Sequence, residues 1–167
     1  QHPEAATRDQ LTNILFNLIK KPNKLQRKTI MDGYIALAAA AGEARTAEEL
    51  LPQCWGQMDH KYPERRVLVA DSCGLLAPHV SPDLRGSLIL SILQQLAADS
   101  AALVREAATS NLATLLPLLP NSNKYSAVQS MLLNAVTDLS EEVVRTAMER
   151  VVPALVAWVV HTDLLAA

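Results

Sequence analysis

The chain has 167 residues, and half of them are hydrophobic. A chain of this size buries about 70% of the surface that it exposes when unfolded, so it can build a sizeable core. Its net charge of −2 argues against general nucleic-acid binding, which usually requires a strongly basic surface.

Apolar helical runs repeat along the chain. Leu15, Cys54, Leu93 and Leu132 stand at equal intervals of 39 residues, and each lies inside such a run. This repeat interval falls within the range of about 20–50 residues that is typical of a solenoid, in which stacked units share one core. The sequence therefore predicts an all-α fold built from successive helix pairs.

The first pair is expected at residues 7–42. Its first helix covers residues 7–21, where apolar residues recur with the period of a helix face. Its second helix covers residues 24–41. Gly42 is a plausible stop, since glycine readily takes up the left-handed conformation that follows many helix ends.

The second pair is expected at residues 46–79. Thr46 and Glu49 have the spacing of a capping box, which places the start of a helix near residue 47. That helix reaches about residue 59. Pro63 fits the first turn of the following helix, where its missing N–H costs nothing.

Two further pairs are expected at residues 81–119 and 123–161. Ser81 is the expected cap of the third pair, and Pro153 is the expected kink in the last helix. The short loops within the pairs make neighbouring helices antiparallel. No Gly- or Ser-rich linker interrupts the chain, so residues 1–167 are interpreted as one continuous array, a segment of a longer protein.

A shared pattern marks the turns of the last two pairs, in residues 99–107 (DSAALVREA) and 138–147 (DLSEEVVRTA). Asp99 and Asp138 are expected to cap the second helices. Arg105 and Arg145 are expected to hold carboxylates or carbonyls between adjacent pairs, because the guanidinium fork suits such groups. Weaker copies follow in the earlier pairs, with Asp59 and Arg66 in the second and Lys28 in the first.

This pattern resembles the HEAT repeat. The resemblance implies a right-handed α-solenoid of about four antiparallel HEAT-like helix pairs, with the second helices on the concave side. It also implies that the Asp and Arg positions form an internal ladder.

Longer strings carry a closer resemblance. They are residues 11–20 (LTNILFNLIK), 50–55 (LLPQCW), 60–66 (HKYPERR), 68–74 (LVADSCG), 87–95 (SLILSILQQ) and 103–107 (LVREA). They are similar to the HEAT-repeat region of the RELCH family, the LisH-domain- and HEAT-repeat-containing Rab-binding proteins. The resemblance implies a cytoplasmic adaptor, peripheral on recycling endosomes and the trans-Golgi. Such proteins bind an activated Rab GTPase and oxysterol-binding protein and support non-vesicular cholesterol transfer.

Basic residues gather at two corners of the expected array. They are the candidate partner-binding residues Lys20, Lys21, Lys24, Arg27, Lys28, Lys61, Arg65 and Arg66. If the two corners are equivalent, they form one ridge that suits an acidic protein surface or anionic lipid headgroups, each cation contributing about 1 kcal/mol at a charged membrane. The alternative is an ordinary solvated loop.

No catalytic, cofactor-binding or metal-binding constellation emerges. Cys54 and Cys73 lack zinc spacing and are interpreted as buried, reduced thiols. Cys73 and His79 are too far apart on one helix for a nucleophile pair. No phosphate-binding glycine loop, apolar span of membrane length or signal peptide is evident. The expectation is a non-enzymatic cytoplasmic protein without a cofactor or a small-molecule substrate.

Two other functions remain open for a helical array of this kind. One is a tubulin-binding array of the TOG type, although few aromatic residues stand beside cations in the turns. The other is a scaffold subunit of an enzyme complex. Fold analogy does not separate these alternatives from an endosomal adaptor, because function depends on particular sites.

Overall fold

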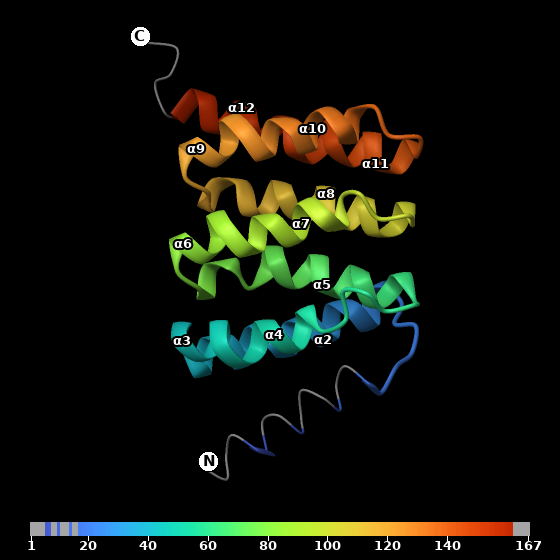
Figure 1. Cartoon of the computed structure of the whole chain (residues 1–167), viewed down its shortest axis with the longest axis vertical. Helices are drawn as coiled ribbons and strands as arrows, with labels where there is room; N and C mark the ends of the chain where they lie inside the picture. The colour runs from blue at the N-terminus through green and yellow to red at the C-terminus, as the bar shows by residue number, and fades with distance from the viewer. Residues whose placement is uncertain (1–5, 8–9, 11–13, 15–16, 162–167) are drawn as a thin grey trace.

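The structure of the chain is a computed structural model that describes residues 6–7, 10, 14 and 17–161. All secondary-structure elements in these residues are helices, as predicted, and short turns connect them. The helices lie one above another along the long axis of the molecule (Figure 1). The first predicted helix, at residues 7–21, falls largely outside the described residues.

Four long helical segments have the positions predicted for second helices. They are α2 (Lys24–Ala41), α5 (Pro63–Leu75), α8 (Ala102–Leu115), and the run α11 (Glu141–Thr146), η6 (Ala147–Val151) and α12 (Val152–His161). The segments between them are α3 (Glu43–Arg45), η1 (Thr46–Leu50) and α4 (Leu51–Trp55); α6 (Pro82–Leu84), η3 (Arg85–Ile89) and α7 (Leu90–Leu96); and α9 (Asn121–Asn123), η5 (Lys124–Val128) and α10 (Gln129–Val136).

The repeat interval of the sequence recurs in backbone detail. The π-helical turns η1, η3 and η5 begin at Thr46, Arg85 and Lys124, which stand at that same interval. The 3₁₀ turns η2 (Ala77–His79) and η4 (Leu116–Leu118) follow α5 and α8 with the same spacing. Local sequence therefore gives successive pairs the same irregularities as well as the same helices.

Most predicted helix boundaries agree with the structure. Gly42 ends α2 with φ of 84°, a backbone conformation that favours glycine. Ser81 accepts a hydrogen bond from the Leu84 N–H and caps α6. The prediction that Thr46 begins the third helix is wrong, because α3 begins at Glu43. Thr46 is buried, and its hydroxyl donates to the Gly42 carbonyl at 2.8 Å.

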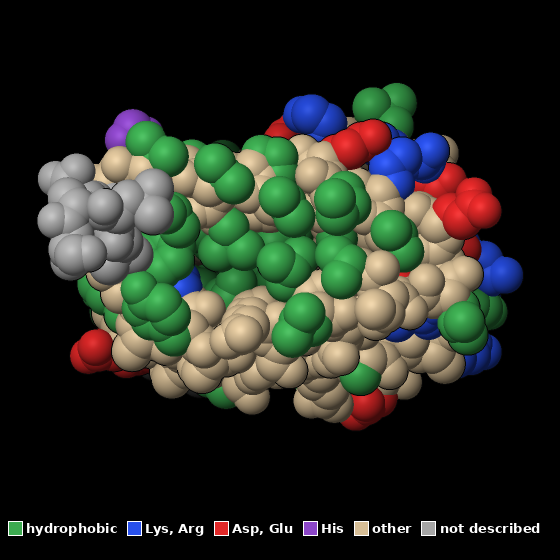
Figure 2. Space-filling view, turned by 90° about the horizontal axis from the view of Figure 1, so that it is seen from above, with side chains coloured by type: hydrophobic (Ala, Val, Ile, Leu, Met, Phe, Trp, Pro, Cys, Tyr) green, Lys and Arg blue, Asp and Glu red, His purple; other side chains and the backbone are tan. Residues whose placement is uncertain are grey.

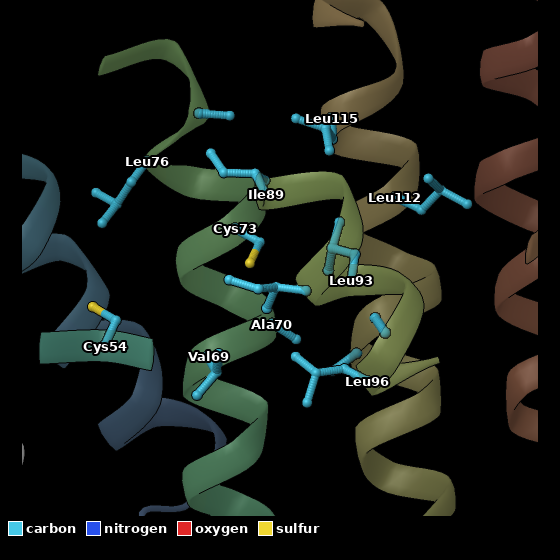
Figure 3. Packing of buried hydrophobic residues seen from close by; sticks show 14 of the residues in the cluster. Cys54, Val69, Ala70, Cys73, Leu76, Ile89, Leu93, Leu96, Leu112 and Leu115 are labelled. Atoms are coloured by element: carbon cyan, nitrogen blue, oxygen red, sulfur yellow. The ribbon is translucent and has the colours of Figure 1, made fainter. Parts of the chain in front are cut away.

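A continuous apolar core joins the stacked helices. Figure 3 shows Ile89, Leu93 and Leu96 beside α5 and α8, with Ala70 and Leu112 contributed by those helices. The largest fully buried side chains include leucines from every layer between α4 and η4. Successive helical layers of the described residues therefore share one core, and their packing on one another stabilises the fold.

Both cysteines belong to this core. Cys54 and Cys73 are buried and free, as predicted. Burial raises the pKa of the Cys73 thiol to about 12 and that of Cys54 further. Both thiols are therefore protonated at neutral pH and are poor nucleophiles.

The end of the array at α10 and α12 differs from the interior. Hydrophobic side chains gather across this face (Figure 2). Leu93 and Leu116 are fully buried, whereas Leu132 and Leu155, each one repeat interval further on, are only partly buried. Inside the stack, the next helical layer covers such leucine positions. At this face, the equivalent positions are only partly covered. Within the described residues, no helix is long and apolar enough to span a membrane.

Candidate interaction surfaces

Two arginine–aspartate pairs link successive second helices. Arg66 donates through Nε and Nη2 to the two carboxylate oxygens of Asp99, at 2.7 and 2.8 Å. Arg105 makes the same bidentate contact with Asp138, at 2.8 and 2.9 Å. Asp99 and Asp138 each also accept a backbone N–H two residues further on, at 2.8 Å. Each aspartate therefore orders its own turn and binds the preceding pair, and we call these two contacts the rungs.

Arg145 does not form a third rung, although the sequence pattern places it beside Arg105. It pairs with Glu142 on its own helix, and both side chains are exposed. Arg66 and Arg105 are the fourth residues of α5 and α8, whereas Arg145 is the fifth residue of α11. One residue rotates a side chain by about 100° around a helix, which turns Arg145 out of the row.

The first pair supplies an arginine to the same row without a rung. Arg27 stands one repeat interval before Arg66 and donates to the Pro22 carbonyl at 2.9 Å, much as Arg66 donates to the His60 carbonyl. His60 follows Arg27 at the same sequence distance as Asp99 follows Arg66. Because His60 has no carboxylate, Arg27 has no rung partner at the equivalent position. Arg27 is therefore the counterpart of the rung arginines, rather than Lys28 as the sequence comparison suggests. The repeat interval is the signal that identifies it.

The two predicted basic corners meet at Tyr62. The Lys21 and Lys61 ammonium groups lie 4.8 and 5.0 Å from the centre of its ring. Burial and the charges of Arg65, Lys61 and Arg66 lower the pKa of nearby His60, as expected in a positive field.

The eight basic candidates differ in their exposure and in their ion pairs. Lys20, Lys21, Lys24 and Lys61 are exposed, while Lys28 pairs with Asp32. Arg65 is only 3% exposed and Arg66 belongs to a rung. Arg27 is partly buried. Partner binding at these eight residues remains a prediction. Burial of Arg65 and pairing of Arg66 with Asp99 make these two less accessible than the exposed lysines.

A groove of about 1130 Å³ runs across the second helices. Its lining comes from the start of α2, from α5 and α8, and from α11 and η6. Met31, Val67 and Ala107 contribute buried apolar surface, and Leu75 and Leu103 are more exposed. The groove is slightly larger than the roughly 300–1,000 Å³ of most small-molecule sites. Sequence reasoning did not identify this groove, because its walls come from four helix pairs.

Polar contacts between neighbouring helices cross the groove. The Asn111 amide donates to Asp71 at 2.9 Å, and the Thr146 hydroxyl donates to Glu106 at 3.1 Å. Arg150 donates to the hydroxyls of Ser110 and Thr114. Burial raises the pKa of Asp71 despite the Asn111 hydrogen bond.

Because of the rungs, we expect the stability of the fold to fall in acid. The Arg105 hydrogen bonds lower the pKa of Asp138. At Asp99 burial is the largest single effect and raises the pKa, but the Arg66 and Ala101 hydrogen bonds and the charges of Arg66 and Arg105 together lower it. A carboxyl group whose pKa is lower in the folded protein than its value of about 3.9 in the unfolded chain stabilises the fold at pH values above that unfolded pKa. This stabilisation is lost as the pH falls through the pKa of the folded state. We therefore expect Asp138→Asn to be destabilising at neutral pH and the difference to shrink in acid. Urea unfolding from about pH 7 to about pH 3 measures this; a constant difference would contradict it.

Together the helices and rungs define an all-helical protein whose helix pairs recur at one constant interval. In the part of the chain that the structure describes, no cluster of histidine, cysteine and carboxylate side chains suits a metal ion. The chain belongs to the family of the RAB11-binding protein RELCH N-terminal domain, whose family model matches residues 1–166.

Relatives from several vertebrates support this assignment. The chain is 49% identical to the human and mouse proteins named RAB11-binding protein RELCH, and 48% identical to the zebrafish homologue. Each match extends over 158 residues, which are 94% of this chain and 13% of the relative. The chain thus spans a small part of the length of these proteins.

Proposed function

We propose that this chain is a segment of a non-enzymatic adaptor that binds a Rab GTPase. The family match over residues 1–166, together with relatives named for RAB11 binding, carries the proposal. The open groove and the exposed lysines around Tyr62 provide surfaces on which a protein partner can dock.

We further propose that the helix pairs form a right-handed HEAT-type solenoid, continuous over residues 1–167. The recurrence of the π turns at the repeat interval supports this arrangement. The rungs support it as well, because Arg66–Asp99 and Arg105–Asp138 are the same contact made by successive pairs. In a solenoid each unit contacts its neighbours, so an extended face is available to a partner.

The finer function follows the family resemblance. The proposal places the adaptor in the cytoplasm, peripheral on recycling endosomes and the trans-Golgi network. There it acts with oxysterol-binding protein in non-vesicular cholesterol transport. The exposed Lys21 and Lys61 are the residues through which an anionic membrane would contact this segment.

A pull-down tests the Rab-binding proposal. Immobilised chain is incubated with RAB11 loaded with a GTP analogue or with GDP, and with oxysterol-binding protein in a parallel sample. We expect the GTP-analogue form to be retained more strongly than the GDP form. Failure to retain either form of RAB11 would contradict a Rab-binding role for this segment, and retention of oxysterol-binding protein alone would assign it to the sterol-transfer partner.

A further inference from the structure

The groove across the second helices contains exposed apolar surface. Leu75 on α5 is 37% exposed and Leu103 on α8 is 42% exposed, and both line the groove. Met31 and Val67 lie in the same lining and are almost completely buried. A partner that covers Leu75 and Leu103 removes apolar area from water, which favours association.

Charge in the groove is arranged unequally. Lys24, Arg27 and Lys28 lie at the α2 side together with Asp32, which pairs with Lys28. Asp71 and Glu106 lie further along on α5 and α8, and Glu142 and Arg150 lie beyond them on α11 and η6. The hydrogen-bond donors to the carboxylates of Asp71 and Glu106 are the neutral side chains of Asn111 and Thr146. Among the described residues, neither of these two carboxylates takes part in a salt bridge.

This arrangement disfavours the charged form of Asp71. Asp71 is partly buried, and burial raises its pKa because the charged carboxylate loses solvation; the negative charge of Glu106 acts in the same direction. Arg27 acts in the opposite direction without forming a salt bridge to Asp71. A cation brought between Asp71 and Glu106 would offset both effects.

We propose that the Rab GTPase docks in this groove through an apolar segment that carries a basic side chain. The basic side chain lies between Asp71 and Glu106, and the apolar residues beside it cover Leu75 and Leu103. An acidic group of the same partner faces Lys24 and Arg27 at the α2 side. This inference rests on the proposed Rab-binding function and assigns the groove, rather than the lysines around Tyr62, as its site.

Two groove variants test the two kinds of contact. Asp71→Asn combined with Glu106→Gln removes both charges and retains the shape and an acceptor for Asn111. Leu75→Ser combined with Leu103→Ser removes the apolar contact. The matched controls are Asp83→Asn on α6 and Leu88→Ser on η3, which are exposed positions outside the groove; Leu88 is 45% exposed, close to Leu103.

Affinity for RAB11 loaded with a GTP analogue is measured by calorimetry for each variant, with thermal unfolding followed by circular dichroism to establish that each is folded. We expect each groove pair to weaken binding at least about tenfold, the loss of about 1.4 kcal/mol, while the controls bind like the unchanged chain. We also expect the charge pair to reduce the dependence of affinity on salt.

The outcomes separate this inference from the function on which it rests. If the unchanged chain binds and the groove variants bind as tightly as the controls, the groove is not the docking site and the Rab-binding proposal stands. Loss of binding in Lys21→Glu with Lys61→Glu but not in the groove variants would move the site to the basic corner. If the unchanged chain does not bind RAB11, both proposals fail.

Discussion

Replacing Gly74 with alanine is expected to lower the free energy of unfolding by about 2 kcal/mol, because a buried helix contact has no room for a methyl group. A Cβ atom at this position would lie 2.2 Å from Oδ1 of Asn111 and 3.0 Å from its Cγ. Asn111 is itself buried and donates to Asp71 and to the Ala107 carbonyl. Moving Asn111 aside to relieve the overlap would weaken those bonds, and we expect this cost to outweigh the gain of about 1 kcal/mol in helix propensity.

Gly56→Ala is the matched control for this prediction. Its added Cβ would meet only backbone oxygens of Pro52 and Gln53, at 3.5 and 3.6 Å, which is ordinary contact. We expect a change within about 0.5 kcal/mol, as at most exposed sites. Chemical denaturation of both variants measures the difference. Equal stability of the two would show that Asn111 moves aside at little cost and that the contact between α5 and α8 is loose.

Replacing Arg105 with alanine is expected to destabilise the chain by about 2 kcal/mol, between the values typical of exposed and fully buried ion pairs. Its side chain is 19% exposed and that of Asp138 is 11% exposed. The substitution removes two charge-assisted hydrogen bonds to Asp138 and one each to the carbonyls of Asp99 and Ser100. Among the residues that the structure describes, Asp138 would keep the Ser140 N–H as its one donor.

Arg145→Ala provides the control because it removes the same side chain from an exposed pair on one helix. We expect a loss of no more than about 0.5 kcal/mol. A double-mutant cycle with Asp138→Ala isolates the rung itself and should give a coupling of about 1 kcal/mol or more. Equal losses in the two arginine variants would mean that the rung adds no more than a surface pair.

The sequence predicted the helical content and most of the boundaries, since their signals are local. The apolar period, Gly42 after α2 and Ser81 before α6 each act within a few residues of the backbone that they shape. The Thr46 prediction failed because a capping-box spacing also occurs inside helices. Gly42 had already ended α2, so the new helix started directly at Glu43.

For the interaction surfaces, the sequence supplied the residue types but not their partners. It marked Asp99, Arg105, Asp138 and Arg145 as one repeating set. It placed Arg66 both in a weaker copy of that set and in the basic corner. The partner of Arg66 lies 33 residues away on the next pair, and only the stacking brings the two together. Arg145 matches the same sequence pattern but lies on a different face of its helix, and a comparison of residue types alone does not reveal this.

The repeat, the helix pairs and the family were thus determined by the sequence alone, because each depends on spacing along the chain. The tertiary structure decided which charges are paired, which are buried and where a groove opens. Asp71 and Asn111 are 40 residues apart, as are Glu106 and Thr146. Their contacts depend on how one helix pair packs on the next, and that packing is fixed by the shape of many side chains together.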